Sequence, residues 1–358
     1  MLRSGVSGLS YSAFAALTFA VFFFIPWRLL TVPLYVVAAL GLALVTLAIG
    51  LALSLQRRQT AGSGHHQPAQ SSDESALRTA VLLAGLGITV RLVWVWLVPP
   101  VQYSDFLSYW NLAAQLVETG TYSEFVLGHE LRAFRPVGLP LLLAGGIQLF
   151  GPSPVVPVAV NLIAYLGSTA FIYSIAGRLG GPAAALIGVG LFAAYPANIA
   201  ITGLAATEPL SACLYIGTCW GLLRAMWGSM GHAVLSGVML GAAILVRPSF
   251  QPAVLAAITV VIGMRGSAPS KVRTMLLFLA GVALILTPWA ARNYQVFGEF
   301  VLVSTNGGDI FYRANNPLAT GGYVPTGERP LDEFLMNETE WNRTGYAWGL
   351  EWIRAHPA

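Results

Sequence analysis

Asp105 is the residue in this sequence best placed for acid–base chemistry, because it opens a polar loop that follows an apolar segment. Only 9% of the residues are charged, and a carboxylate at the edge of an apolar environment is costly to keep without a function. Such a carboxylate can remove the proton of an attacking hydroxyl group. The alternative is a helix-dipole role in the first turn of a helix, worth about 0.3 to 1 kcal/mol. The residue types alone leave both interpretations open.

The composition indicates an integral membrane protein. Hydrophobic residues make up 56% of the chain and the mean hydropathy is +0.68, whereas about a quarter of the residues of soluble proteins are charged. A membrane-spanning helix needs about 20 apolar residues, and the 358 residues accommodate several such helices. We therefore predict an all-α integral membrane fold. The net charge of +4 is interpreted as membrane topology, and no nucleic-acid partner is expected.

Apolar windows divide the chain into four parts. Residues 1–55 are predicted to form a transmembrane hairpin, and residues 56–76 a flexible cytoplasmic linker rich in Ser, Gln and Gly. Residues 77–290 form the predicted transmembrane bundle, which contains a first outer loop over 99–154, and residues 291–358 form an outer C-terminal segment. The windows predict nine spans, two in the hairpin and seven in the bundle, the latter over 77–98, 155–176, 183–201, 209–226, 233–246, 250–264 and 274–290.

The basic residues predict the orientation of these spans, since Lys and Arg collect on the cytoplasmic side of membranes. They fall in alternate connections, which we therefore assign to the cytoplasm: Arg57, Arg58, Arg78, Arg178, Arg224, Arg265, Lys271 and Arg273. The loops 99–154 and 291–358 then face outward and carry most of the polar and aromatic residues. The sequence thus predicts a multi-pass protein of the cell membrane with its active site on the outer face.

Two juxtamembrane helices are predicted in the first outer loop. The first has Ser104 as N-cap, Asp105 in the first turn and Gly120 as its C-terminal stop. Its apolar residues recur at helical spacing, which predicts an amphipathic helix on the membrane surface with its aromatic face among the lipid headgroups. The second apolar segment, 137–150, is too short to span comfortably and is expected to form a re-entrant or surface helix.

Several motifs occur in a characteristic order: YSDFLSYWNLAAQLVETG, RPVGLPLLLAGGIQLFG, GRLGG, AATEPL, LVRPS, PWAARNYQVFG and STNGGDIFYRANNPLATGGY. Together they resemble the bacterial membrane glycosyltransferases of the family 39 type, such as mannosyl and aminoarabinose transferases, in the GT-C superfamily. The resemblance covers roughly residues 77–358 and implies a GT-C-like helical bundle. It also implies an inverting hexosyl or pentosyl transferase that moves a sugar from a polyprenyl-phosphate carrier to a lipid, glycan or protein acceptor.

The resemblance assigns roles to two acids. The essential acid of the family maps to Asp105, which would act as the base that deprotonates the acceptor hydroxyl group. Glu208 corresponds to a second acidic position, where it would orient the acceptor or hold a divalent cation, Mg²⁺ or Mn²⁺, together with Asp105. The alternative is a structural role, in which Glu208 is an exposed acid that caps the helix starting at Pro209.

Four arginines are singled out for different reasons. A lipid-phosphate leaving group requires fixed positive charge, and Arg135, Arg247 and Arg292 are predicted at the outer ends of segments, where a planar guanidinium can bind phosphate. Snorkelling toward lipid headgroups is the alternative for each. Arg91 lies inside a predicted span, so it is expected to face the bundle interior with a partner that the sequence does not name.

Asn306 and Asp309 belong to a Gly-rich run whose default interpretation is a tight turn. The resemblance makes both candidates for contact with the acceptor or the sugar. A phosphate-cradling glycine loop is absent from the sequence, which disfavours a nucleotide-sugar donor. The alternative functions are a lipid-linked-sugar transporter and a non-catalytic or truncated partner subunit, the latter favoured because the chain stops where similar proteins continue. A transporter would show paired, broken helices in its two halves, and the sequence lacks this symmetry.

Overall fold

The computed structural model describes residues 69–126, 129–226, 228–264, 266–321 and 337–356. The predicted N-terminal hairpin and the first part of the predicted linker lie outside the described residues. The end of the linker differs from its prediction, because helix α3 (Ala69–Leu97) begins at Ala69. Arg78 pairs with Glu74 one turn earlier at 2.6 Å, and such a pair four residues apart stabilises a helix.

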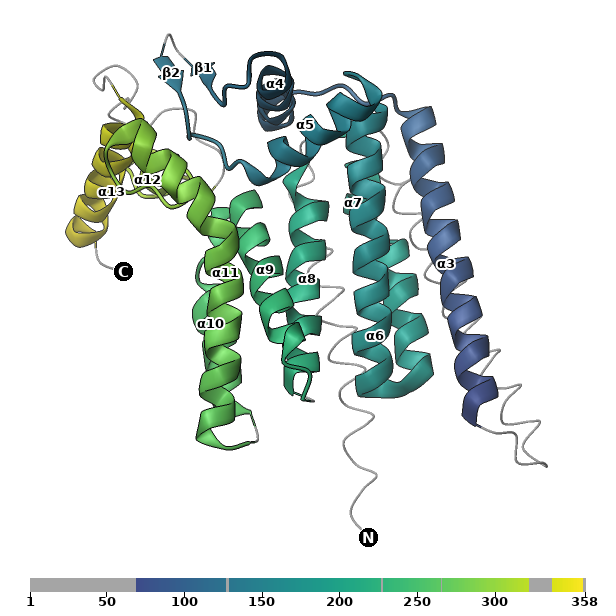
Figure 1. Ribbon diagram of the computed structural model, residues 1–358. Coiled ribbons are helices and arrows are strands. Elements are labelled where there is room, and N and C mark those ends of the chain that lie inside the picture. The colour runs from purple at the N-terminus through teal and green to yellow at the C-terminus, as the bar shows by residue number, and fades with distance from the viewer. Residues whose placement is uncertain (1–68, 127–128, 227, 265, 322–336, 357–358) are drawn as a thin grey trace.

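Helices account for nearly all regular structure in the described ranges, which confirms the predicted all-α class (Figure 1). The exception is a small antiparallel hairpin of β1 (Glu124–Val126) and β2 (His129–Leu131), in which Phe125 is opposite Glu130. The other elements are α4 (Ser104–Thr119), α5 (Gly138–Phe150), α6 (Val155–Ala193), α7 (Pro196–Ala200), α8 (Thr207–Met226), α9 (Gly231–Val246), η2 (Pro248–Phe250), α10 (Ala253–Gly263), α11 (Ala268–Phe297), α12 (Gly307–Ala314) and α13 (Glu338–Ala355).

Among the described residues, three helices are long and apolar enough to cross a membrane, namely α3, α6 and α11. The shorter helices α9 and α10 are also apolar, and α8 is 20 residues long. These helices lie side by side and are roughly aligned, as Figure 1 shows. The arrangement is a membrane helix bundle, and its helices occupy the windows that the sequence predicts for the spans.

Helix α6 consists of two antiparallel rods rather than one. The break is at Gly181, whose φ of 76° and ψ of −176° are not helical, and Pro182 follows directly. The second rod ends at Ala193, eight residues before the predicted end of this span. Tyr195 has an extended backbone with ψ of 110°, because the ring of Pro196 disfavours the helical region for the preceding residue.

Helix α9 lies at the centre of the bundle and has its most extensive contacts with α11 and α8. Gly237 and Gly241 are four residues apart on the face toward α11, and a Cβ atom at Gly237 would collide with the backbone of Phe278. Small residues at this spacing let helix backbones approach closely, which strengthens the dispersion contacts that hold membrane helices together. Phe278 is fully buried at this contact.

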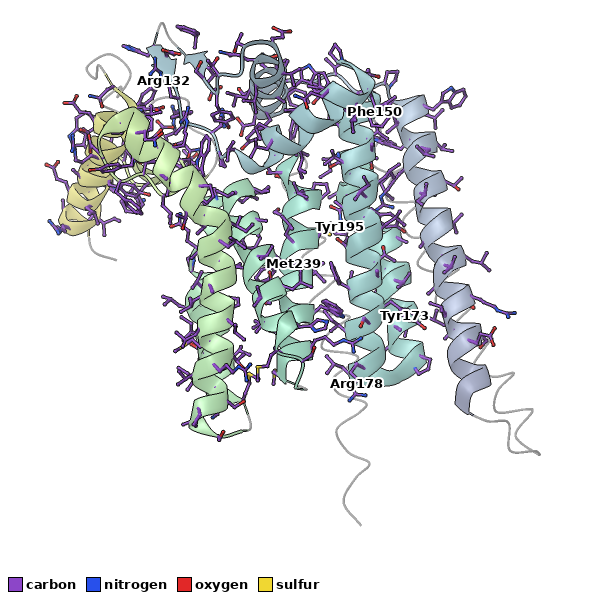
Figure 2. All side chains as sticks on the ribbon, in the orientation of Figure 1. Arg132, Phe150, Tyr173, Arg178, Tyr195 and Met239 are labelled. Carbon is purple, nitrogen blue, oxygen red and sulfur yellow. The ribbon has the colours of Figure 1, made fainter. Side chains whose placement is uncertain are left out.

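The two ends of the bundle differ in the elements that they carry. One end, called the α4 end here, carries α4, α5, the β-hairpin, α12 and α13 (Figure 1). The other end carries the break in α6 and the connections from α8 to α9 and from α10 to α11. Arg178 lies at this second end, opposite Arg132, as Figure 2 shows. Arg178, which is expected in the cytoplasm, and Arg132 of the first outer loop therefore lie at opposite ends of the bundle.

Helix α4 differs in two respects from its prediction. Tyr103 occupies the N-cap position without a capping side-chain bond, and Ser104 is the first helical residue, with an unusual φ of 49°. The predicted stop at Gly120 is confirmed, since this residue is left-handed with φ of 70°. The apolar face does not point toward headgroups, because Tyr109 and Ala113 on this face pack in a core cluster with α5. The apolar face of α4, which the periodicity predicted to contact lipid, therefore packs against protein.

Candidate active site

Asp105 and Arg135 form the ion pair at the centre of the candidate site. One oxygen of the Asp105 carboxylate lies 2.9 Å from a terminal nitrogen of Arg135. The Asp105 side chain is 58% exposed, whereas that of Arg135 is 19% exposed. The acid is therefore accessible to a ligand, and its partner is anchored in the protein. Helix α4 presents Asp105 in its first turn, directly after the strained backbone of Ser104, and such strain often marks functional sites.

The backbone of Arg135 is held by Tyr122, which is buried. The Tyr122 hydroxyl group donates toward the carbonyl oxygens of Arg135 at 3.0 Å and Pro136 at 3.1 Å. Its ring meets Trp289 of α11 edge to face at 5.2 Å, and burial raises the pKa of Tyr122 well above its ordinary value. Tyr122 therefore remains a neutral donor and keeps Arg135 in place beside Asp105.

Glu124 is a second carboxylate beside Arg135, and sequence reasoning did not single it out. Its Oε1 atom lies 3.7 Å from the Nε atom of Arg135, but the two atoms form no hydrogen bond. Burial raises the pKa of Glu124, and the charge of Arg135 opposes this shift. Arg135 thus has one tight and one loose acidic partner, and its guanidinium group retains donor capacity for another ligand.

Glu208 and Arg247 form a second ion pair at the same end of the bundle. Their side chains meet at 2.8 Å and are 48% and 40% exposed, respectively. Glu208 begins α8, and Arg247 stands in extended conformation between α9 and η2. The structure therefore brings together two residues that are 39 positions apart in sequence.

Tyr109 connects the two ion pairs electrostatically. Burial raises the pKa of Tyr109 to about 12, and the charges of Arg135, Asp105, Arg247 and Glu208 also act on its hydroxyl group. The guanidinium carbon of Arg135 lies 5.9 Å from the centre of the Tyr109 ring. Tyr109 also packs in the core cluster that contains Leu210 and Val246, which lie close to Glu208 and Arg247 in the chain, so both pairs lie near one neutral phenol. Four of the residues predicted for the site share one neighbourhood, which offers two carboxylates and two guanidinium groups.

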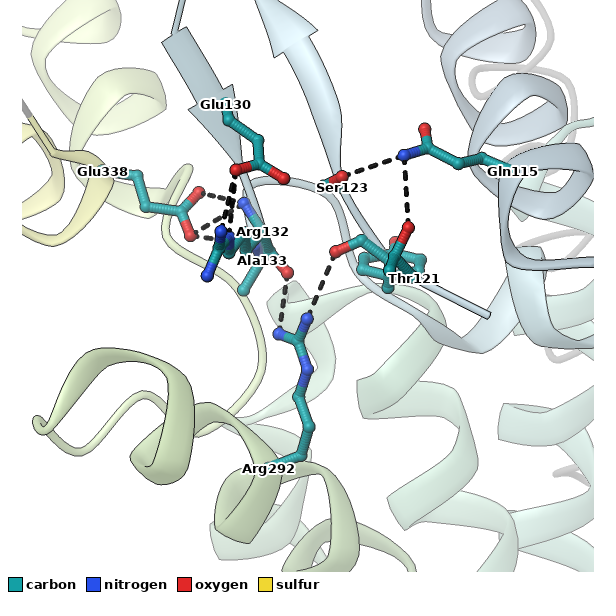
Figure 3. Close-up of polar contacts among 9 residues, drawn as sticks. Gln115, Thr121, Ser123, Glu130, Arg132, Ala133, Arg292 and Glu338 are labelled. Carbon is teal, nitrogen blue, oxygen red and sulfur yellow. Dashed lines mark hydrogen bonds and ion pairs between the residues drawn. The ribbon is translucent and has the colours of Figure 1, made fainter. Parts of the chain in front are cut away.

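Arg292 has a different environment from Arg135 and Arg247. Its terminal nitrogens donate to the carbonyl oxygens of Arg132 at 2.8 Å and Tyr122 at 3.2 Å, as Figure 3 shows. It also donates to Asn293 at 3.1 Å and lies over the ring of Trp289. These bonds fasten the first loop to α11. In the structure Arg292 therefore connects two parts of the backbone. Its sequence position at the end of a span is equally compatible with this role and with phosphate binding.

Glu338 joins the first loop to the C-terminal helix α13, and sequence reasoning passed over it. Its buried carboxylate accepts hydrogen bonds from the backbone N–H groups of Arg132, at 3.0 and 3.1 Å, and Ala133, at 2.9 Å (Figure 3). Thr305 donates to the same carboxylate at 3.3 Å. Burial raises the pKa of Glu338 to about 7, although these hydrogen bonds oppose the shift. The only sequence signal was its position between Asn337 and Thr339, which matches a glycosylation triplet.

Asn306 and Asp309 are occupied by local contacts. Asn306 is the N-cap residue of α12 and accepts a hydrogen bond from Ser304 at 2.9 Å. Asp309 is buried and pairs with Arg313 one turn later at 2.8 Å. These contacts of Asn306 and Asp309 stay within residues 304–313. The structure therefore does not bring these two candidates together with the acids of the site.

Arg91 is buried in the bundle, as its position in a span predicted, and its partners are now visible. Its Nη1 atom donates to the carbonyl oxygens of Gly87 and Ala193, both at 3.0 Å. Its guanidinium carbon lies 3.8 Å from the centre of the Tyr165 ring. Ala193 is the last residue of α6, so Arg91 places positive charge at the negative end of a helix dipole.

The residues do not fit a divalent cation as they stand. Among the described residues no group of three or more His, Cys, Asp or Glu side chains could hold a metal ion. Asp105 and Glu208 each lie within 3 Å of a guanidinium group, which would compete with and repel a cation.

The comparisons with known proteins agree with the membrane fold. Residues 135–291 match the family described as dolichyl-phosphate-mannose-protein mannosyltransferase. The match covers less than half of the chain, begins at Arg135 and includes Glu208 and Arg247. No curated protein matched the chain. The family match and the membrane helices together support a membrane glycosyltransferase of the GT-C type, whose donor is a sugar carried on a polyprenyl phosphate.

Proposed function

We propose that this protein transfers a sugar from a polyprenyl-phosphate carrier to an acceptor hydroxyl group at the outer face of the membrane, with Asp105 as the base. The observation that carries the proposal is the meeting of the Asp105–Arg135 and Glu208–Arg247 pairs around Tyr109. Acids for proton transfer and guanidinium groups for phosphate are thus present in one place. All four residues lie at the α4 end of the bundle, where the sequence places the outer loops.

The reaction is a single displacement at the anomeric carbon. The acceptor oxygen forms the new bond to this carbon, and the bond from the carbon to the phosphate oxygen breaks on the opposite side. The electron pair of the broken bond leaves with the polyprenyl phosphate, and the acceptor proton passes to the Asp105 carboxylate. Configuration at the carbon is therefore inverted. Arg135 and Arg247 are assigned to the phosphate, whose growing negative charge they stabilise.

Donor binding would also prepare the base. Arg135 holds Asp105 at 2.9 Å, and an ion-paired carboxylate accepts a proton less readily than a free one. The phosphodiester of the donor offers two unesterified oxygens to the planar guanidinium fork, so it competes with Asp105 for Arg135. When Arg135 turns to the phosphate, Asp105 is released for the acceptor, and Glu124 remains close to balance the arginine charge.

The test is Asp105→Asn in the full chain reconstituted into lipid vesicles, with a short-chain polyprenyl-phosphate mannose as donor. Asn keeps the shape of the side chain and cannot take the proton, so turnover should fall by at least about 100-fold. Glu118→Gln, which removes an exposed acid near the other end of α4, is the matched control and should retain wild-type turnover. Near-normal turnover by Asp105→Asn would remove the base assignment. Donor binding by the wild-type chain without any transfer would favour a transporter or a non-catalytic subunit.

A further inference from the structure

A hollow between α12 and α13 lies outside the Asp105 neighbourhood and has no part in the proposed transfer step. Its volume is about 200 Å³, and its main lining residues are Tyr312, Asn316, Pro317, Trp348, Glu351 and Trp352. The two helices stand at the α4 end of the bundle (Figure 1). The hollow is therefore on the same side of the protein as the candidate active site.

Tight packing between α12 and α13 fixes one side of the hollow. A Cβ atom on Gly308 would collide with the backbone of Asn342, and one on Gly345 would collide with the backbone of Gly308. The Gly308 N–H group also donates to the Asn342 side chain at 2.7 Å. Substitution by a larger residue would force the helices apart. Their relative position, and with it the hollow, is set by these close contacts.

Asn316 fixes the opposite wall. This residue is buried, and its amide nitrogen donates to the carbonyl oxygens of Tyr312 and Arg313, both at 2.9 Å. Its amide oxygen accepts from the Leu318 N–H group at 2.8 Å. All of these bonds stay within one turn of chain, so Asn316 holds the wall in shape. When the walls of a cavity are already fixed, ligand binding costs little free energy for ordering side chains.

The chemistry of the lining matches a sugar ring. Trp348 meets Tyr312 edge to face at 5.4 Å, and Trp352 stacks on His356 at 3.6 Å, so both indole rings are held in position. Sugar rings carry an apolar C–H face that packs on aromatic rings and a rim of hydroxyl groups. Glu351 also lines the hollow, and a carboxylate accepts hydrogen bonds from hydroxyl groups. The volume is below the range of about 300 to 1,000 Å³ for drug-sized ligands, which limits the occupant to about one ring.

Lipid contact is assigned to a different face of α13. A helix turns about 100° per residue, so the exposed apolar residues Tyr346, Leu350 and Ile353 lie on the side opposite Trp348 and Trp352. A membrane surface would contact the first set. The second set faces the hollow together with Glu351, whose carboxylate lipid tails would not satisfy.

We infer that the hollow is a saccharide subsite that binds one sugar ring of a glycan. Its use by the acceptor rests on the proposed function, whereas the binding itself does not. The subsite is also linked to the catalytic loop, because Glu338 at the start of α13 holds the backbone of Arg132 and Ala133, close to Arg135 in sequence. A glycan seated here would be positioned by the same helix that fixes the loop.

The experiment is saturation-transfer NMR with the full chain in nanodiscs, and the probes are methyl α-mannopyranoside and methyl β-glucopyranoside. At least one probe should bind with a dissociation constant on the order of 1 mM, as expected for so small a ligand. Trp352→Ala should weaken binding at least about tenfold, and Glu351→Gln should weaken it by a smaller factor. Leu350→Ala, on the opposite face of α13, is the matched control and should bind like wild type.

Three outcomes would overturn the subsite: neither probe binds the wild-type chain, Trp352→Ala and Glu351→Gln both bind like wild type, or Leu350→Ala loses as much binding as Trp352→Ala. If Trp352→Ala fails to fold, Glu351→Gln with an unchanged circular dichroism spectrum decides the question. Asp105→Asn serves to separate the two proposals. If Asp105→Asn still binds the sugar probe but no longer transfers sugar, both proposals are supported. If the wild-type chain transfers sugar normally but binds neither probe, only the subsite is refuted.

Discussion

Glu338 offers the most direct test of how helix α13 is attached to the first loop. Burial raises the pKa of this carboxyl group from 4.5 to about 7, and its residue is only 4% exposed. When α13 leaves the loop, the group returns to water and its pKa to the ordinary value. A difference of about 2.5 pH units corresponds to about 3 kcal/mol. This is the most by which the pH can change the free energy of docking through this one group.

The direction of the effect follows from proton binding. Between pH 4.5 and about 7 the docked state keeps a proton on Glu338 that the released state has lost. Docking is therefore most stable at and below pH 4.5, and it weakens as the pH rises through the pKa of the docked state. The fraction of molecules in which the loop and α13 have separated should rise by about 100-fold across this interval.

Hydrogen–deuterium exchange at the Arg132 and Ala133 N–H groups measures this opening, because both groups donate to Glu338. After correction for the intrinsic pH dependence of exchange, their protection should fall as the pH rises from about 5 to about 8. Glu338→Gln should abolish this slope. Glu340→Gln, two residues further along α13, removes an acid without these bonds and should keep it. A flat wild-type profile, or an equal slope in Glu338→Gln, would refute the reasoning.

Three further predictions concern the donor, the topology and the bundle. Arg247→Lys should raise the KM for the donor more than that for the acceptor, because Lys lacks the planar fork. Arg292→Lys should loosen the first loop and change both KM values. Equal effects of the two variants on the donor KM would contradict the different roles of Arg247 and Arg292. In a variant without native cysteines, Glu118→Cys should react with an impermeant thiol reagent outside intact cells and Ser267→Cys should not; the reverse pattern would invert the topology. Gly237→Val should lower the thermal unfolding temperature in detergent, since a side chain there collides with the backbone of Phe278. An unchanged temperature would show that α9 and α11 can move apart without loss of stability.

The helices could be predicted from the sequence because membrane helices have a strong local signal. Each apolar window satisfies its own backbone hydrogen bonds, so length and hydropathy identify it without reference to the rest of the chain. The stop of α4 at Gly120 was equally local, since glycine accepts the left-handed conformation that ends a helix. Where a neighbouring proline decided the end of a helix, as at Pro196, the apolar composition extended the predicted span too far.

The partners of the charged residues were not local and required the tertiary structure. Arg135, Arg247 and Arg292 are all predicted at the outer ends of segments, yet Arg135 and Arg247 pair with acids and Arg292 donates to backbone carbonyls. Side-chain charge is visible in a sequence, whereas the partner depends on which helix ends meet in space.

Residue type and hydropathy were thus sufficient for the membrane class and for most helix bounds, whereas the resemblance to a family selected Asp105, Glu208 and Arg135 as candidates. Only the packed bundle showed that Asp105 is held by Arg135, that Glu208 and Arg247 meet around the same Tyr109, and that the aromatic face of α4 is buried in protein. The physical reason is the range of the interactions. Helix formation acts over a few residues, whereas ion pairs and the burial of Glu338 join segments that are 30 to more than 200 positions apart in the chain.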